Sequence, residues 1–259
     1  MRLVIKVGTS SISNAKANSI NFFMIETLTH TISRLIDEGN EVILVTSGAV
    51  GYGVVKLAER NKQYADPNYA PTLAEKPFLA SVGQPLLMKH YIDSFDHYKK
   101  QAAQILVSSV GDFEHNLATK TILTTLNNGA IPIVNENDSV YDAELKIGDN
   151  DTLSAHVAEY TRANHLFLIT DIDGLHTKED GKLGELVKTV HADEIEKYME
   201  FADGSSSVIA IGGMLTKLTA AKIADSAGCV THIIQNTEVV NIHKIIHGAE
   251  IGTTIGGLR

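Results

Sequence analysis

Six short apolar runs, most of them rich in β-branched residues, recur along the chain and alternate with longer stretches of helical periodicity. The runs are LVIKV (3–7), EVILV (41–45), QILV (104–107), IPIV (131–134), HLFLI (165–169) and THII (231–234). Strands of this length that alternate with helices are typical of β-α units, in which consecutive strands pair in parallel. The sequence therefore predicts an α/β fold built around a mainly parallel sheet.

The helices are expected between these runs, and several of them end at a glycine, as a C-cap would. Their expected ranges are 19–38, 48–59, 77–98, 115–128, 151–162, 192–202 and 214–227. Two other stretches, 139–147 and 173–185, are rich in turn residues and predict hairpins or exposed loops. Residues 59–76 form the least regular stretch.

The chain has 259 residues, of which 44% are hydrophobic and 20% charged, so it can bury a full core. We expect one domain over residues 1–259, with substrate binding and oligomerisation in its amino-terminal part and nucleotide binding in its carboxy-terminal part. The formal net charge of -9 argues against a nucleic-acid partner, because phosphate neutralisation needs an excess of clustered Lys and Arg.

Cysteine content and hydropathy bear on location. Cys229 is the only cysteine, so no internal disulfide can form, as is usual in a reducing compartment. Lys6 interrupts the apolar run at the N-terminus, which argues against a signal peptide, and no apolar segment approaches spanning length. We expect a cytoplasmic protein with no membrane partner.

Small or polar residues follow nearly every predicted strand. They are Gly8-Thr9-Ser10, Thr46-Ser47-Gly48-Ala49, Asn135-Glu136-Asn137-Asp138 and Thr170-Asp171-Ile172-Asp173-Gly174. In open parallel sheets the ligand binds outside the carboxyl ends of the strands. The sequence therefore predicts a binding site for a polar, charged ligand at this edge.

The glycines favour a phosphate ligand. Gly8, Gly48 and the Gly212-Gly213 pair let backbone N–H groups approach a ligand closely, and helix N-termini behind them favour negative charge. Neither a G-x-x-x-x-G-K-[ST] loop nor a G-x-G-x-x-G turn after a predicted strand occurs. The nucleotide motifs of P-loop and dinucleotide-binding proteins are thus absent from the sequence.

Two lysines stand out by position. Lys6 lies inside the first apolar strand, where a charge is costly unless it is paired or faces a ligand. Lys217 follows Gly213 at the start of a predicted helix. Considered alone, Lys217 is more simply explained as a solvated side chain than as a ligand-binding group. For Lys6 these two explanations are evenly balanced. Their occurrence beside glycine turns favours a role in binding phosphate.

Six motifs together resemble the amino acid kinase family. They are IKVGTS (5–10), VTSGAV (45–50), IVNENDSV (133–140), KIGDNDTLSA (146–155), ITDIDGL (169–175) and IGGMLTKLTAA (211–221). The resemblance implies a three-layer α/β/α sandwich and ATP as co-substrate. It is strongest to members that phosphorylate the side-chain carboxylate of L-glutamate, the first step of proline biosynthesis, and implies the form without a C-terminal PUA domain.

The chemistry of such a reaction suits these residues. A glutamate side chain with a pKa of about 4.3 is already ionised at neutral pH, so the nucleophile needs no general base. The remaining task is to bring two anions together and to neutralise charge on the transferred group. Lys6 and Lys217 are the candidate cationic clamp, aided by Mg²⁺ carried on the nucleotide rather than by protein ligands.

Further roles follow from the resemblance alone. It implies that Asp151 orients the two lysines, with Asp149 supporting the same network. It implies that Asp138 accepts the α-ammonium group of glutamate while neutral groups hold its carboxylate oxygens, namely Ser47, Asn135 and Asn150. It also implies a nucleotide site formed by Lys6, Gly8, Thr170, Asp171, Ile211, Gly212, Gly213, Met214, Leu215, Thr216 and Lys217.

Several alternatives stay open. The Asn-Glu-Asn-Asp and Gly-Asp-Asn-Asp clusters could be Asx turns and helix caps, with Asp151 as an N-cap. The same fold could phosphorylate N-acetylglutamate, aspartate, carbamate or UMP, or could be a non-catalytic sensor of amino acids or nucleotides. The resemblance also suggests proline as a feedback inhibitor and a homo-oligomer, either a dimer or a tetramer.

Overall fold

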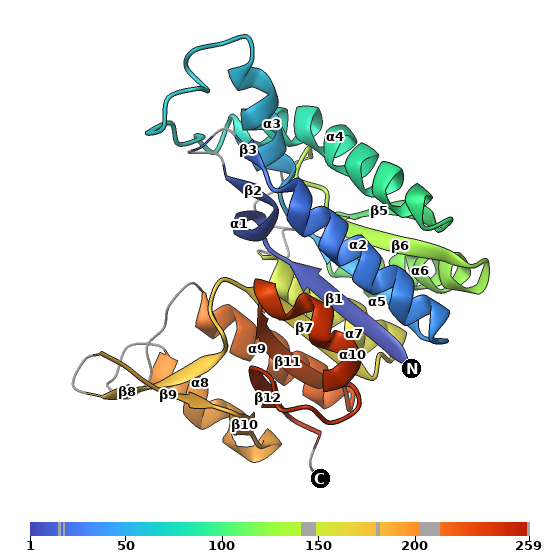
Figure 1. Ribbon diagram of the computed structural model, residues 1–259, viewed down its shortest axis with the longest axis vertical. Coiled ribbons are helices and arrows are strands. Elements are labelled where there is room, and N and C mark those ends of the chain that lie inside the picture. The colour runs from blue at the N-terminus through green and yellow to red at the C-terminus, as the bar shows by residue number, and fades with distance from the viewer. Residues whose placement is uncertain (15–16, 18, 141–148, 180–181, 203–212, 258–259) are drawn as a thin grey trace. The chain divides into compact units, whose positions relative to one another are not determined.

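In the computed structural model, which describes residues 1–14, 17, 19–140, 149–179, 182–202 and 213–257, eight strands form a mainly parallel sheet with helices around it (Figure 1). The strand order is β10-β12-β11-β7-β1-β4-β6-β5. The strands are β1 (Arg2–Val7), β4 (Glu41–Thr46), β5 (Gln101–Val107), β6 (Ala130–Glu136), β7 (His165–Thr170), β10 (Thr189–Val190), β11 (Val230–Gln235) and β12 (Thr253–Ile255). All six apolar runs lie in strands, so the predicted fold class is confirmed.

The register of the strands shows which parts of the sheet are parallel. β11 pairs in parallel with β7, where Ile233 lies opposite Leu168, and β5 pairs in parallel with β6, where Ile105 lies opposite Val134. β12 runs antiparallel to β11. The central strands are buried along most of their length, which is why they are continuous apolar runs rather than alternating ones.

The expected helices are present close to their ranges. The helices are α1 (Thr9–Ile12), α2 (Phe22–Asp37), α3 (Ala49–Ala58), α4 (Lys76–His97), α5 (Gly111–Glu114), α6 (Leu117–Asn127), α7 (Asn150–Thr161), α8 (Ile195–Ala202), α9 (Met214–Ser226) and α10 (Ile242–Ile245). Three of them, the four-residue helices α1, α5 and α10, were not expected. Short 3₁₀ segments cover Ala192–Glu194 and Asn236–Asn241.

The expected helix at 19–38 starts too early. Residues Ser19–Ile20 form β3, which pairs with β2 (Ser13–Asn14). The helix begins only at Phe22, because the Asn21 side chain accepts a hydrogen bond from the backbone N–H of Met24 at 3.1 Å, as an N-cap does.

The two expected hairpins have different outcomes. Within 173–185, β8 (Leu175–Glu179) pairs antiparallel with β9 (Lys182–Val187), so this hairpin is confirmed. The His176 ring bridges Gly184 O at 2.9 Å and the Asp173 carboxylate at 2.6 Å. The other stretch, 139–147, lies largely outside the described residues. Residues 59–75 contain turns and no helix or strand.

The backbone contacts divide the chain into two compact units. Unit 1 comprises Met1–Lys6, Leu35–Ile43 and Gly148–Arg259, and unit 2 comprises Val7–Arg34 and Leu44–Ile147. In unit 1, α9 packs beside α7 and α8 and against β11. In unit 2, α3 and α4 lie side by side. The single domain expected from the sequence stays a prediction.

Two neighbouring residues of β5 show how unit 2 is layered. Gln104 lines a cavity with residues of α4, whereas Ala103 lines a different one with residues of α6. Successive side chains of a strand point to opposite faces, so α4 and α6 cover opposite faces of β5.

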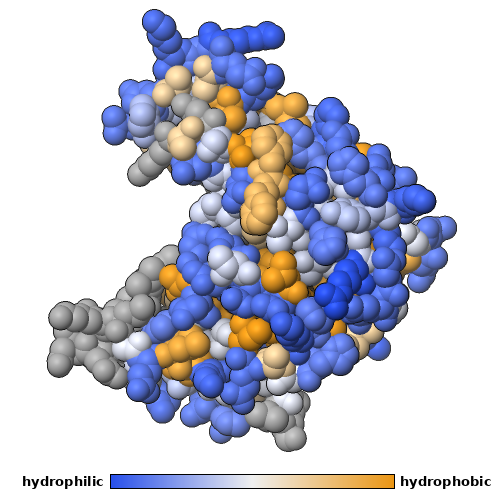
Figure 2. Space-filling view, viewed as in Figure 1, coloured by the Kyte–Doolittle hydropathy of each residue, from blue (hydrophilic) through white to orange (hydrophobic). Residues whose placement is uncertain are grey.

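The surface in Figure 2 is covered largely by hydrophilic side chains, with smaller hydrophobic areas between them. In the part of the chain that the structure describes, no helix combines the length and the apolar character needed to cross a membrane.

Candidate active site

A buried cluster of two cations and one anion lies in unit 1. The Lys6 ammonium group is 2.6 Å from Asp151 Oδ1, and the Lys217 ammonium group is 3.2 Å from Asp151 Oδ2. All three side chains are buried: Lys6 is 8% exposed, Lys217 is 6% exposed and Asp151 is 4% exposed. Thr216 also donates its hydroxyl hydrogen to Asp151 Oδ2 at 2.9 Å. One carboxylate thus fixes the positions of two ammonium groups.

The local folding of three elements explains this arrangement. Lys6 occupies the carboxyl end of β1, and Asp151 lies in the first turn of α7. Lys217 lies in the first turns of α9, which begins after Gly213 in the left-handed conformation with φ 74°. Glycine adopts this conformation without steric cost, so the chain can turn sharply into the helix that carries the lysine.

The electrostatics of the cluster favour an anionic ligand. Burial alone would raise the pKa of Asp151, but the adjacent ammonium groups of Lys6 and Lys217 outweigh it and lower this pKa. Asp151 is therefore ionised at neutral pH, and the three groups together carry one net positive charge. A positively charged cluster of this kind attracts an anionic group such as a phosphate.

The other residues expected on the nucleotide side also belong mainly to unit 1. Thr170 ends β7, and Asp171 accepts from the Asn236 side chain at 3.4 Å. The sequence 213–217 forms the start of α9, with Met214 buried and Leu215 and Thr216 beside it. Gly8, in unit 2, precedes the short helix α1. Ile211 and Gly212 lie outside the described residues.

Asp149 has a different set of contacts from Asp151. It is the N-cap of α7, and its two carboxylate oxygens accept from the backbone N–H and the hydroxyl of Thr152, both at 2.9 Å. The alternative that Asp151 caps this helix is therefore wrong, because the helix begins one residue earlier than expected, at Asn150.

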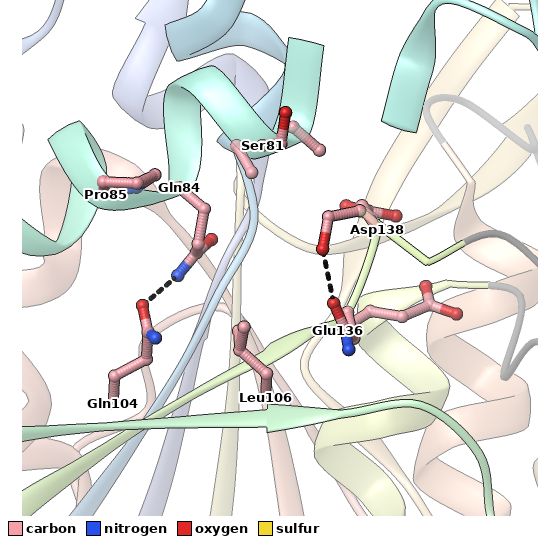
Figure 3. A pocket seen from close by; sticks show the side chains of 11 residues that line it. Ser81, Gln84, Pro85, Gln104, Leu106, Glu136 and Asp138 are labelled. Atoms are coloured by element: carbon pink, nitrogen blue, oxygen red, sulfur yellow. Dashed lines mark hydrogen bonds between the residues drawn. The ribbon is translucent and has the colours of Figure 1, made fainter. Parts of the chain in front are cut away.

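A second polar site lies in unit 2, as a cavity of about 290 Å³ (Figure 3). It is formed by the start of α3, the middle of α4, strand β5 and the residues that end and follow β6. The lining residues are Ala49, Ala80, Ser81, Gln84, Pro85, Gln104, Leu106, Glu136, Asn137, Asp138 and Ser139. The volume is at the lower end for ligand pockets, about 300–1,000 Å³, and suits a metabolite of amino-acid size.

The four residues expected to bind the substrate are divided between the units. Asp138 lines the cavity in unit 2. Asn135 lies behind it, buried, and donates to the Gln84 side chain at 2.9 Å. Ser47 follows β4 and donates its backbone N–H to Val7 O at 3.1 Å. Asn150 is the first residue of α7 in unit 1.

Sequence reasoning missed two long polar side chains of this cavity, those of Gln84 and Gln104. Gln84 and Gln104 lie in the middle of a helix and a strand rather than at a strand end. A signal was available at Gln84, which stands between Gly83 and Pro85 inside a helix, where such residues are unfavourable without a structural reason. Glu136, which was named at the end of a predicted strand but given no role of its own, also lines the cavity.

Among the residues that the structure describes, no group of three or more His, Cys, Asp or Glu side chains is arranged to hold a metal ion. The described carboxylates of unit 1 thus offer no preformed cation cage, and the cationic cluster would repel a bare metal ion.

Comparisons with known proteins agree with this fold. Residues 1–235 match the sequence model of the amino acid kinase family. Glutamate 5-kinase of Picosynechococcus sp. is 40% identical, over 97% of this chain and 67% of that protein. Glutamate 5-kinase of Thermoanaerobacter sp. (strain X514) is 39% identical, over 98% of this chain and 67% of that protein.

Two solved structures share the fold at low sequence identity. Giardia carbamate kinase has a TM-score of 0.70 at 16% identity, with 98% of each chain covered. Isopentenyl phosphate kinase of T. acidophilum has a TM-score of 0.62 at 16% identity, with 98% of this chain and 100% of that chain covered. The parallel sheet is the fold of these structures, and the buried lysine pair would suit an anionic ligand. The chain belongs to the amino acid kinase family.

Proposed function

We propose that this protein transfers the γ-phosphoryl group of ATP to the side-chain carboxylate of L-glutamate, forming L-glutamyl 5-phosphate. The similarity to two glutamate 5-kinases over nearly the whole chain supports the choice of substrate. The observation that carries the proposal is the pair of buried lysines held by Asp151, because it is the arrangement that a transferring phosphoryl group requires.

In this proposal most of the nucleotide contacts come from residues of unit 1. Lys6 and Lys217 contact the phosphates, and Asp151 holds both ammonium groups so that little reorganisation is needed when charge develops on the transferred group. Backbone N–H groups at the start of α9 add to the positive potential. Bound Mg²⁺ would supply further charge neutralisation on the phosphates. The remaining nucleotide contacts are assigned to Gly8, Thr170, Asp171 and the segment 211–216.

The acceptor amino acid is assigned to the four residues that the sequence predicts to bind the substrate. Asp138 accepts from the α-ammonium group, and the neutral side chains of Ser47 and Asn150 serve the carboxylate oxygens, since another carboxylate would repel them. Asn135, buried behind Gln84, supports this site without touching the ligand. Because the glutamate side chain is ionised at neutral pH, no described residue needs to act as a base. Asp149 contributes by capping the helix that carries Asp151.

A substrate panel tests the proposal. Purified protein with ATP and Mg²⁺ is offered L-glutamate, L-aspartate, N-acetyl-L-glutamate, carbamate or UMP, and ADP release is measured. Hydroxylamine in parallel assays traps an acyl phosphate as the hydroxamate. Fastest ADP release and hydroxamate formation with L-glutamate are expected. Faster turnover of another acceptor contradicts the substrate assignment, and ligand binding without ADP release shows a sensor.

Three further expectations belong to the proposal. Proline, which shares the ammonium and carboxylate groups of glutamate, would compete for the amino-acid site and lower initial rates at limiting glutamate. The protein would form a homo-oligomer, and it would act in the cytoplasm, in keeping with its single cysteine. Unchanged initial rates in the presence of proline would contradict the first of these.

A further inference from the structure

The cavity of unit 2 is chemically two-sided. Figure 3 shows the side chains of Gln84 and Gln104 pointing toward one another at one side and those of Glu136 and Asp138 at the other. The first pair offers neutral amides and the second offers carboxylates. A ligand that carries both an anionic and a cationic group would match this distribution.

A chain of hydrogen bonds links the amides. The backbone N–H of Glu136 donates to Asn135 Oδ1, Asn135 Nδ2 donates to Gln84 Oε1, and Gln84 Nε2 donates to Gln104 Oε1, each at 2.9 Å. Amide oxygen and nitrogen can usually exchange places, but a backbone N–H can only donate. It therefore fixes the orientation of Asn135, and through it the orientations of Gln84 and Gln104.

The direction of the chain determines what reaches the cavity. Asn135 is 1% and Gln84 is 8% exposed, whereas Gln104 is exposed. The oxygen of Gln104 accepts from Gln84, and no described residue accepts a hydrogen bond from its Nε2. The chain thus ends in an amide NH₂ group that can only donate, at the cavity wall opposite the carboxylates.

We propose that Gln104 binds the α-carboxylate of the acceptor amino acid and that Gln84 and Asn135 are positioning residues that keep its NH₂ group facing the ligand. This inference rests on the proposed function. The α-carboxylate is a better partner for Gln104 than the side-chain carboxylate, because it serves only as an anchor. The reacting side-chain carboxylate must keep a lone pair directed at phosphorus, so strong donors on its oxygens would slow the attack.

Two ligands that differ by one group test the assignment. 4-Aminobutyrate is L-glutamate without its α-carboxylate, so binding of both is measured by isothermal titration calorimetry. For Gln104→Leu, L-glutamate should bind at least about tenfold more weakly, while binding of 4-aminobutyrate changes less than about twofold. Gln101→Leu is the matched control, since Gln101 is on the same strand, is exposed, bonds to Ala102 O and does not line the cavity.

A separate variant, Gln84→Glu, tests the positioning role of Gln84. In Gln84→Glu, the carboxylate still accepts from Asn135 but can no longer donate to Gln104. Gln104 must then turn its NH₂ group toward Glu and present its oxygen to the ligand. The preference for L-glutamate over 4-aminobutyrate should fall as far as in Gln104→Leu, which a merely structural effect on both ligands would not produce.

Each outcome decides the inference. An unchanged preference in Gln104→Leu, or an equal loss for both ligands, overturns it, and ADP release by the wild-type protein with L-glutamate then leaves the proposed function standing. If Gln104→Leu loses the preference, and the wild-type protein binds L-glutamate but releases no ADP, the inference is supported while the proposed function is contradicted. Absence of L-glutamate binding by the wild-type protein overturns both.

Discussion

Lys6 and Lys217 contact the two different oxygens of a single buried carboxylate, although they lie 211 positions apart in the sequence. Each lysine comes from a separate element, β1 or α9, so the pair exists only in the folded chain. Two ammonium groups this close would repel each other without Asp151. The same carboxylate therefore serves both the stability of unit 1 and the geometry of the proposed phosphate site.

Asp151→Asn should destabilise the protein strongly. The amide keeps the size of the side chain but leaves two buried ammonium groups without their counter-charge, which costs about 3–5 kcal/mol in the free energy of unfolding. Urea denaturation measures this loss. The control is Asp93→Asn, which breaks an exposed pair with Lys89 and should cost less than about 1 kcal/mol. Equal losses in the two variants would contradict the account.

Acid should weaken the protein through His232. Burial, with a smaller contribution from the adjacent His165 at 3.0 Å, lowers the pKa of its ring to about 3. In acid the ring therefore binds a proton in the unfolded chain but not in the folded chain. The contribution of His232 to the free energy of unfolding is fully present above about pH 6.5 and is lost as the pH falls toward 3. Between pH 7 and pH 5 this one group removes about 2 kcal/mol.

The matched variants for this effect are His232→Gln and His247→Gln. The first removes the titrating group, so the difference in unfolding free energy between pH 7 and pH 5 should shrink by about 2 kcal/mol. The second alters an exposed histidine of the same unit and should leave that difference unchanged. Identical pH dependence in all three proteins would show that His232 does not titrate as its burial implies.

Gly83→Ala should disturb the packing of α3 against α4. A Cβ atom at this position would lie 1.8 Å from Ala49 O and 2.5 Å from Gly53 N, both of them backbone atoms that cannot move aside cheaply. We expect a loss of about 1–3 kcal/mol, measured by urea denaturation, and weaker L-glutamate binding because Gln84 is the next residue. In Gly111→Ala, the nearest atom is the Ser109 hydroxyl at 3.3 Å, so little change is expected. A stable Gly83→Ala variant would contradict this packing.

The main strands and helices could be predicted from sequence because their signals are local. The run at 165–169 is continuously apolar after His165, and β7 covers His165–Thr170. The short strands β10 and β12 could not be predicted, since two or three residues carry no periodicity and their pairing partners lie far away in the chain. For the same reason the strand at Ser19–Ile20 was absorbed into the expected helix.

The residues of the candidate site also fall into those that could be predicted from the sequence and those that could not. Residues at strand ends, such as Lys6 and Asp138, could be chosen from the sequence because the fold class tells where a ligand binds. Gln84 and Gln104 could not, because their importance lies in one hydrogen bond between the middle of a helix and the middle of a strand. The sequence also cannot show that Asn135 is buried behind Gln84 rather than open to the cavity.

The most direct test of the central claim is the turnover number of Lys217→Ala. If this lysine neutralises charge on the transferring phosphoryl group, kcat for ADP release with L-glutamate should fall at least about 100-fold, while the Kd of L-glutamate changes little. Lys222→Ala, on the same helix but exposed and paired with Glu196, should keep the wild-type kcat. A Lys217→Ala protein with kcat close to that of the wild type would contradict the account.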